Sequence, residues 1–140
     1  MKIFRGILTL LLSLILLVPA ALPAIAAPPV TGGDATVTLL NLLPTNLAVG
    51  QSYIVNILVK SNEAFTSATA QNAVEFPAYL SDSRDNASHT TSAVLHVTLT
   101  GRRSTTGLPG GSTSATLYIG VRHQNGQLNV TPFSYTVAVH

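Results

Sequence analysis

The chain contains no cysteine and no tryptophan, and charged residues make up only 9% of its 140 positions. Without cysteine there are no disulfides, so a small disulfide-held scaffold is excluded and a hydrophobic core has to stabilise the fold. With so few charges, the surface must consist largely of uncharged polar side chains. Exposed tryptophan platforms, which many carbohydrate-binding surfaces use, are also excluded.

Basic charge is scarce outside the N-terminus. Lys2 and Arg5 account for the whole formal net charge of +2, because five basic and five acidic residues remain in the rest of the chain. Nucleic acids and anionic membrane surfaces are bound through clustered Lys and Arg side chains. Neither nucleic acid nor a membrane surface is therefore expected as a partner.

One long hydrophobic run is present, and it lies at the N-terminus. Lys2 and Arg5 precede the apolar stretch Ile7–Val18, two prolines follow, and Ala24-Ile25-Ala26 supplies the small residues of a cleavage site. This order predicts a signal peptide over residues 1–26 and a secreted or cell-surface protein without a stable membrane anchor after cleavage.

An uncleaved anchor is the alternative interpretation of the same run. The apolar stretch from Ile7 to Ala27 is long enough to approach the thickness of a bilayer. The prolines and the Ala-x-Ala site favour cleavage, after Ala26 or Ala27.

The remainder of the chain has the period of two that is typical of β-strands. Residues 27–34 are expected to form a flexible N-terminal segment and residues 35–140 a single β-sandwich domain. The expected strands are 35–40, 52–60, 64–69, 73–80, 92–100, 113–123 and 131–139. Ser52–Lys60 is apolar on both faces, which predicts a strand in the middle of a sheet, and Pro77 predicts an edge strand or a bulge. The polar stretch 81–91 is expected to be a loop.

The predicted fold class is all-β, an immunoglobulin-like antiparallel β-sandwich of about seven strands, with an up-and-down barrel as the alternative. Alternation places Leu95, Val97 and Leu99 on the inner face of one strand, and the same pattern recurs along 113–123. Asn125-Gly126 predicts a tight hairpin between the last two strands.

Two stretches carry a family resemblance. Leu43–Lys60, with its proline, Val-Gly-Gln turn and apolar strand, resembles the opening of bacterial immunoglobulin-like and fibronectin-III-like surface modules. Ala115–Val139 is similar to their final hairpin. The resemblance implies a β-sandwich and an extracellular setting, and it assigns no functional residues. The Cys–Trp–Cys core of antibody domains is missing.

The loop Asp82-Ser83-Arg84-Asp85-Asn86 holds the one cluster of carboxylates. Asp82, Asp85 and Asn86 have the oxygen ligands that Ca²⁺ prefers. Against this, Arg84 lies between them and no bidentate glutamate follows. The same residue types are common in turns, so the site is expected to be an ordinary loop, and no cofactor is predicted.

The sequence contains no residues at the spacing that is typical of a catalytic site. The four histidines show no metal-binding spacing and are expected to be solvated surface residues, and no serine lies in a nucleophile elbow. We therefore expect a protein that is not an enzyme.

If the strands that begin near Ser92 and Thr113 are antiparallel, the loops Asp82–His89 and His123–Gln127 lie at the same end of the sandwich, with Arg102 and Arg103 at the other. Binding sites on sandwiches commonly lie in such end loops. The predicted ligand or partner residues are Asp82, Arg84, Asp85, Asn86, His123, Gln124 and Asn125.

The sequence thus predicts a structural or adhesive module that contacts other extracellular proteins or surface polymers. Two alternatives remain open. One is a filament or pilus-like subunit that self-assembles by strand addition, with the segment Ala35–Leu43 as the exchanged strand. The other is a carbohydrate- or calcium-binding accessory domain.

Overall fold

The computed structural model describes residues 34–140 of the chain. The predicted signal peptide and its cleavage site lie outside the described residues. Within residues 34–140 no helix is long and apolar enough to cross a membrane.

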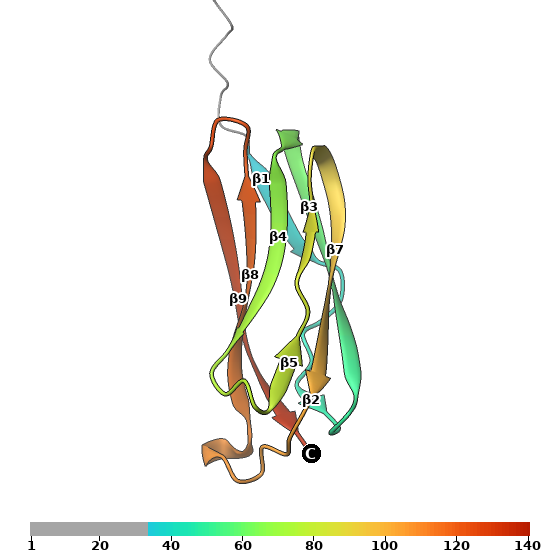
Figure 1. The fold of residues 1–140 in the computed structure, drawn as a ribbon, viewed down its shortest axis with the longest axis vertical. Coiled ribbons are helices and arrows are strands. Elements are labelled where there is room, and N and C mark those ends of the chain that lie inside the picture. Colours follow the sequence, from blue (N-terminus) through green and yellow to red (C-terminus); the bar gives the residue numbers. More distant parts are fainter. Residues whose placement is uncertain (1–33) are drawn as a thin grey trace, which may run out of the picture. The chain divides into compact units, whose positions relative to one another are not determined.

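Nine strands and one short 3-10 turn make up the described part of the chain (Figure 1). They are β1 (Ala35–Leu39), β2 (Asn46–Leu47), β3 (Ser52–Phe65), β4 (Ser67–Val74), β5 (Leu80–Asp82), β6 (Asp85–Ala87), β7 (Thr90–Gly101), η1 (Pro109–Gly111), β8 (Thr113–Arg122) and β9 (Leu128–Val139).

The strands form two sheets that enclose one hydrophobic core. The first sheet has the order β1-β3-β7-β5 and the second the order β2-β9-β8-β4-β6. All neighbouring strands are antiparallel except β2, which runs parallel to β9 over two residues. The fully buried side chains come from both sheets, among them Val55, Ile57, Val97, Leu117 and Ile119. The predicted all-β sandwich is confirmed.

The predicted inner rows are also confirmed. Leu95, Val97 and Leu99 are buried on β7, and the alternating residues of β8 are buried in the same way. β3 lies between β1 and β7, as its two apolar faces predicted. The hairpin at Asn125-Gly126 joins β8 to β9, and Gly126 has a φ of 86°, a conformation that glycine adopts without strain.

The prediction of two strands over 64–69 and 73–80 was wrong. A single strand, β4, occupies Ser67–Val74, and Pro77 lies in the turn that follows it. Tyr79 N donates to Phe76 O at 3.1 Å, so Pro77 takes the second position of a β-turn, where its fixed φ is favourable. β4 contains mostly small residues, and its extent is set by its eight-residue pairing with β8, which local alternation does not reveal.

The predicted loop 81–91 also contains strand residues. β5 pairs with β7 and β6 pairs with β4, so this polar stretch contributes an edge strand to each sheet. The total of nine strands exceeds the expected seven because of these short segments and β2. They are too short to show a hydrophobic period.

Candidate functional site

The segment Leu80–Ala87, which we term the crossing segment, runs along one side of the sandwich between β4 and β7. Its first part pairs with β7 and its second part with β4. It contains most of the predicted partner residues and all of the candidate calcium ligands. Its geometry therefore decides what those side chains can do.

Side-chain oxygens of the crossing segment accept hydrogen bonds from backbone amides at the sheet edges. Asp82 Oδ2 accepts from Asn72 N on β4 at 3.1 Å, and Asp85 Oδ2 accepts from His96 N on β7 at 2.7 Å. Ser83 Oγ accepts from Thr98 N on β7 at 2.9 Å. The two carboxylates thus act as caps that replace a neighbouring strand.

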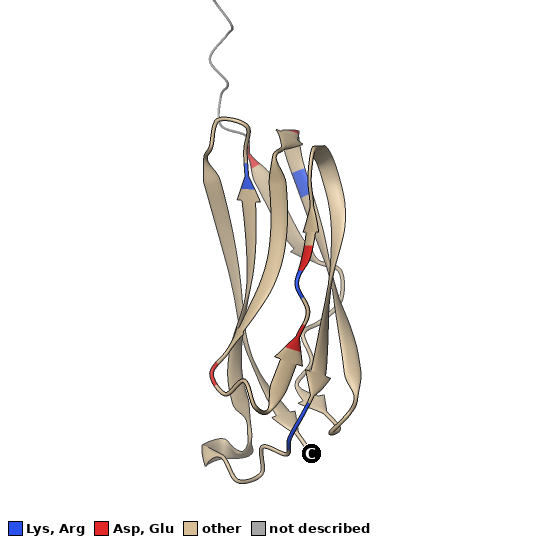
Figure 2. Cartoon of the chain, in the orientation of Figure 1, with Lys and Arg blue, Asp and Glu red and all other residues tan. Residues whose placement is uncertain are grey.

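This arrangement does not gather the candidate calcium ligands. Asp82 is turned toward β4 and Asp85 toward β7, and the second oxygen of Asp85 accepts from Asn86 N at 2.8 Å. Within residues 34–140, no three His, Asp or Glu side chains come together as a metal-ligand group. Figure 2 shows the charged residues of the described part spread along the domain.

Arg84 lies on the outer side of the crossing segment. Its guanidinium donates to Gln71 Oε1 on β4 at 2.8 Å, so it ties the segment to the second sheet. Asn86 is exposed beside Thr69 in the register of β6 and β4. Both residues therefore lie on the outer face of the second sheet, apart from the hairpin residues with which they were predicted to act.

A buried polar pair lies close to Asp82. Tyr135 on β9 donates its hydroxyl to Asn72 Oδ1 at 3.0 Å, and Asn72 is only 6% exposed. Burial raises the pKa of Tyr135 to about 12, and the charge of Asp82 adds to this rise. Tyr135 is therefore a neutral hydrogen-bond donor at ordinary pH and not a general base.

His123 is not a solvated surface residue, and that prediction was wrong. It is 1% exposed, and Asn129 Nδ2 lies 3.1 Å from its Nε2. An amide nitrogen only donates, so Nε2 accepts and the ring proton is on Nδ1, which has no hydrogen-bond partner in the described part of the chain. The period of β8 continues through Val121 to His123, and this signal places the imidazole inside.

The other two predicted hairpin residues are exposed. Asn125 Oδ1 accepts from Gln127 N at 2.9 Å and shapes the turn, and Gln124 lies beside it. His123, Gln124 and Asn125 therefore form one tight loop with one buried member. The polar contacts of this loop are explained by the geometry of the turn.

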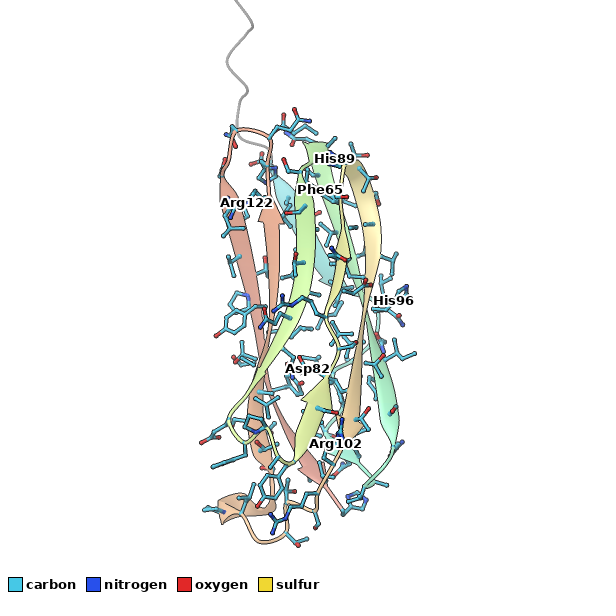
Figure 3. The ribbon with its side chains drawn as sticks, in the orientation of Figure 1. Phe65, Asp82, His89, His96, Arg102 and Arg122 are labelled. Atoms are coloured by element: carbon cyan, nitrogen blue, oxygen red, sulfur yellow. The ribbon has the colours of Figure 1, made fainter. Side chains whose placement is uncertain are left out.

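The predicted neighbourhood of the two end loops holds in part. His89 N donates to Phe65 O and Thr66 N donates to Arg122 O, so the end of the loop Asp82–His89 and the hairpin meet at the β3–β4 junction (Figure 3). Asp82, however, pairs with Leu99, nine residues along β7 from Thr90, or about 30 Å away. The predicted partner residues do not form one cluster. Arg102 lies at the opposite end from Arg122, as expected.

The outer face of β8 and β9 was not predicted as a site. Here Tyr118, Leu128 and Val130 are between 42% and 53% exposed and surround Gly120, while Arg122 lies at the end of β8. We term these five residues the β8–β9 patch. Counting back from Phe133 in steps of two gives the inward-facing residues of β9. Leu128 and Val130 are not among them, so the alternation in the sequence already indicated that both face outward.

No protein-family model matches the chain, and no curated protein sequence matches it. Among solved structures, domains 4 and 5 of the S-layer protein SbsC align with a TM-score of 0.47 and 17% identity, covering 77% of this chain and 53% of that one. A DUF4466 family protein from Parabacteroides merdae aligns with a TM-score of 0.47 and 13% identity, covering 78% and 46%.

AggA, the major subunit of aggregative adherence fimbriae type I from Escherichia coli, aligns with a TM-score of 0.44 and 11% identity, covering 79% of this chain and 97% of that one. This chain spans about half the length of the first two structures. At these TM-scores, neither family nor function follows from the likenesses.

Proposed function

We propose that the protein is an exported, non-catalytic immunoglobulin-like module that contacts other proteins or surface polymers. The observation that supports it best is the use of its polar side chains. The carboxylates of Asp82 and Asp85 accept amides of β4 and β7, and Tyr135 donates to a buried amide oxygen. These groups stabilise a sandwich and leave its outer faces for contact.

Strand connectivity supports the immunoglobulin-like part of the proposal. Lettering β1, β3, β4, β5, β7, β8 and β9 from A to G gives the order ABED in one sheet and GFC in the other. This is the arrangement of constant-type immunoglobulin domains. The short strands β2 and β6 extend the second sheet at its two edges.

For assembly by strand addition, β1 would have to leave its own sheet. In the described domain β1 pairs with β3 over five residues, from Ala35 with Ser61 to Leu39 with Ile57. Asn41 then continues the contact, because its side chain bonds Asn56 N and Ile54 O at 2.7 and 2.8 Å. These contacts favour a self-contained module over an exchanged β1.

The proposal is tested in the cells that produce the protein. We expect the chain outside the cytoplasm, with an N-terminus at Ala27 or Pro28 by mass spectrometry, and we expect the purified protein to bind those cells or their isolated surface polymers. A full-length chain that stays in the cytoplasm would overturn export. An exported chain that binds neither cells nor polymers would overturn the contact role.

A further inference from the structure

Gly120 has no structural reason to be glycine. It lies in the middle of β8, opposite Thr69 on β4 and Val130 on β9. Its φ is not in the left-handed region, and a Cβ built on it would meet only Leu128 Cδ1, at an ordinary 3.6 Å. Glycine inside a strand weakens it, and such positions often mark a close approach by another molecule.

The residues around Gly120 define what would approach. Tyr118 and Arg122 lie two residues away on either side, about 7 Å each along the strand. Leu128 and Val130 are 50% and 53% exposed on the β9 side. The guanidinium of Arg122 donates only to Gly126 O at 3.3 Å, and no carboxylate of residues 34–140 pairs with it. The patch therefore suits an apolar side chain that stands beside a carboxylate.

The turn between β4 and β5 presents this combination. Phe76 is 38% exposed and Glu75 precedes it on the surface. The ring of Phe76 is held edge-on against Tyr79, with centroids 6.3 Å apart, and Arg103 lies 5.4 Å from the Tyr79 centroid. The aromatic side chain is thus held in place before any contact forms, which lowers the entropy cost of docking.

The turn and the patch lie at opposite ends of the second sheet. Glu75 N donates to Ser114 O near the start of β8, whereas Arg122 ends that strand, about 26 Å further on. A contact between different surfaces of two copies is heterologous, and repetition produces an open chain unless the rotation closes a ring.

We propose that copies of this protein associate head to tail, with Phe76 and Glu75 of one copy docked on the β8–β9 patch of the next. Phe76 packs over Gly120, where no side chain projects, and Glu75 pairs with Arg122. Opposite charge on the two surfaces favours a second copy as the occupant. The inference deepens the proposed contact role by naming one partner, and it rests on that role.

The contact is small, so the association is expected to be weak. A stable interface buries about 800 Å² on each partner, whereas the patch extends about 13 Å along β8 and covers two strands. We expect a dissociation constant on the order of 0.1–1 mM. Sedimentation velocity of the protein produced from its full-length sequence, at increasing concentration, measures it directly.

Charge exchange tests the docking geometry. We expect Glu75→Arg and Arg122→Glu each to weaken association about tenfold, and the double variant to recover most of the loss. Lys60→Glu makes the same charge change on the other sheet and is the matched control. Equal weakening by Lys60→Glu, or a double variant no better than the single ones, would overturn the pairing.

Gly120→Val separates docking from folding. A Cβ at this position meets only Leu128 Cδ1 at 3.6 Å and valine favours strands, so the urea midpoint should stay the same or rise, while association is lost because a side chain then occupies the contact surface. Phe76→Ala should weaken association in the same way. A wild-type protein that stays monomeric up to about 1 mM, or a Gly120→Val variant that associates like wild type, contradicts the inference.

Surface binding, measured on the same samples, keeps the two proposals apart. A strictly monomeric protein that still binds producing cells contradicts head-to-tail association and leaves the contact role intact. Loss of association in Ile54→Glu with no loss in Arg122→Glu would assign self-contact to the outer face of β3 and overturn the proposed patch.

Discussion

The side of the sandwich between β4 and β7 is sealed by side-chain oxygens, whereas the side between β1 and β9 keeps a free strand edge. On the first side, Asp82, Ser83 and Asp85 accept the amides of Asn72, Thr98 and His96. Each of these bonds occupies a position that a neighbouring strand would otherwise fill. Beyond these bonds, the crossing segment pairs with Ala68, Thr69 and Ala70 of β4.

The opposite side relies on other devices. Ala138 N donates to Thr45 O beside β2, so the even-numbered residues of β9 direct their backbone groups toward this edge. Within the described residues, no backbone partner follows this edge from Leu128 to Ser134. Pro132 lies in the middle of it and has no N–H to offer, which limits pairing with another chain.

Substitutions at the two edges should therefore have different consequences for stability and for association. The sealed edge depends on a few specific hydrogen bonds, so losing one of them should cost folding stability. The free edge depends on the absence of a donor, so a substitution there should change association more than stability.

Asp85→Ala should have the largest effect, a loss of about 2 kcal/mol in the free energy of unfolding, because the amide of His96 loses a charged acceptor at 2.7 Å. Urea denaturation measures the loss, and hydrogen exchange of the His96 amide should accelerate. Asp34→Ala, at an exposed carboxylate, is the control and should stay within about 0.5 kcal/mol of wild type. Equal effects of the two variants would contradict the capping role.

Asn41→Ala tests the β1 side and should cost about 1 kcal/mol. The amide group bonds Tyr53 Oη, Ile54 O and Asn56 N, but all partners are neutral and partly exposed. The same denaturation experiment applies. If Asn41→Ala destabilises the protein more than Asp85→Ala, the sealed side is not the one that depends more on specific hydrogen bonds.

Tyr135 links the two sides through Asn72, and the pH dependence that it gives to stability should appear only at alkaline pH. Its folded pKa of about 12 lies above the unfolded value of 10.0, so the folded state retains its proton longer. The stabilisation is complete below pH 10 and is lost as the pH rises toward 12. In Tyr135→Phe, this part of the decline in unfolding free energy should be missing. An unchanged decline would contradict the burial of the hydroxyl.

Pro132→Val should change stability least, by about 0.5 kcal/mol or less, and should increase aggregation of the folded protein because a donor returns to the free edge. Light scattering at high concentration measures this. Pro77→Val, in the β-turn, is the matched control and should not aggregate faster than wild type. If both variants aggregate to the same extent, Pro132 does not protect the β9 edge from pairing with another chain.

Much of the fold was predictable because the inner rows of β3, β7 and β8 repeat every two residues. The Asn125-Gly126 turn likewise sets its own geometry. The site was much less predictable. The aspartates of the crossing segment were recognised as oxygen donors, but their partners lie 10 and 11 residues away in other strands. Nothing in a run of polar turn residues shows which amides it will meet.

By itself, the sequence determined that residues from Ala35 onward form an all-β sandwich, because alternation and turn chemistry act between residues that are close along the chain. How Leu80–Ala87 divides between the two sheets, and which backbone amides its oxygens meet, followed only from the tertiary structure. These features depend on which strands become neighbours, and that is set by packing the whole core.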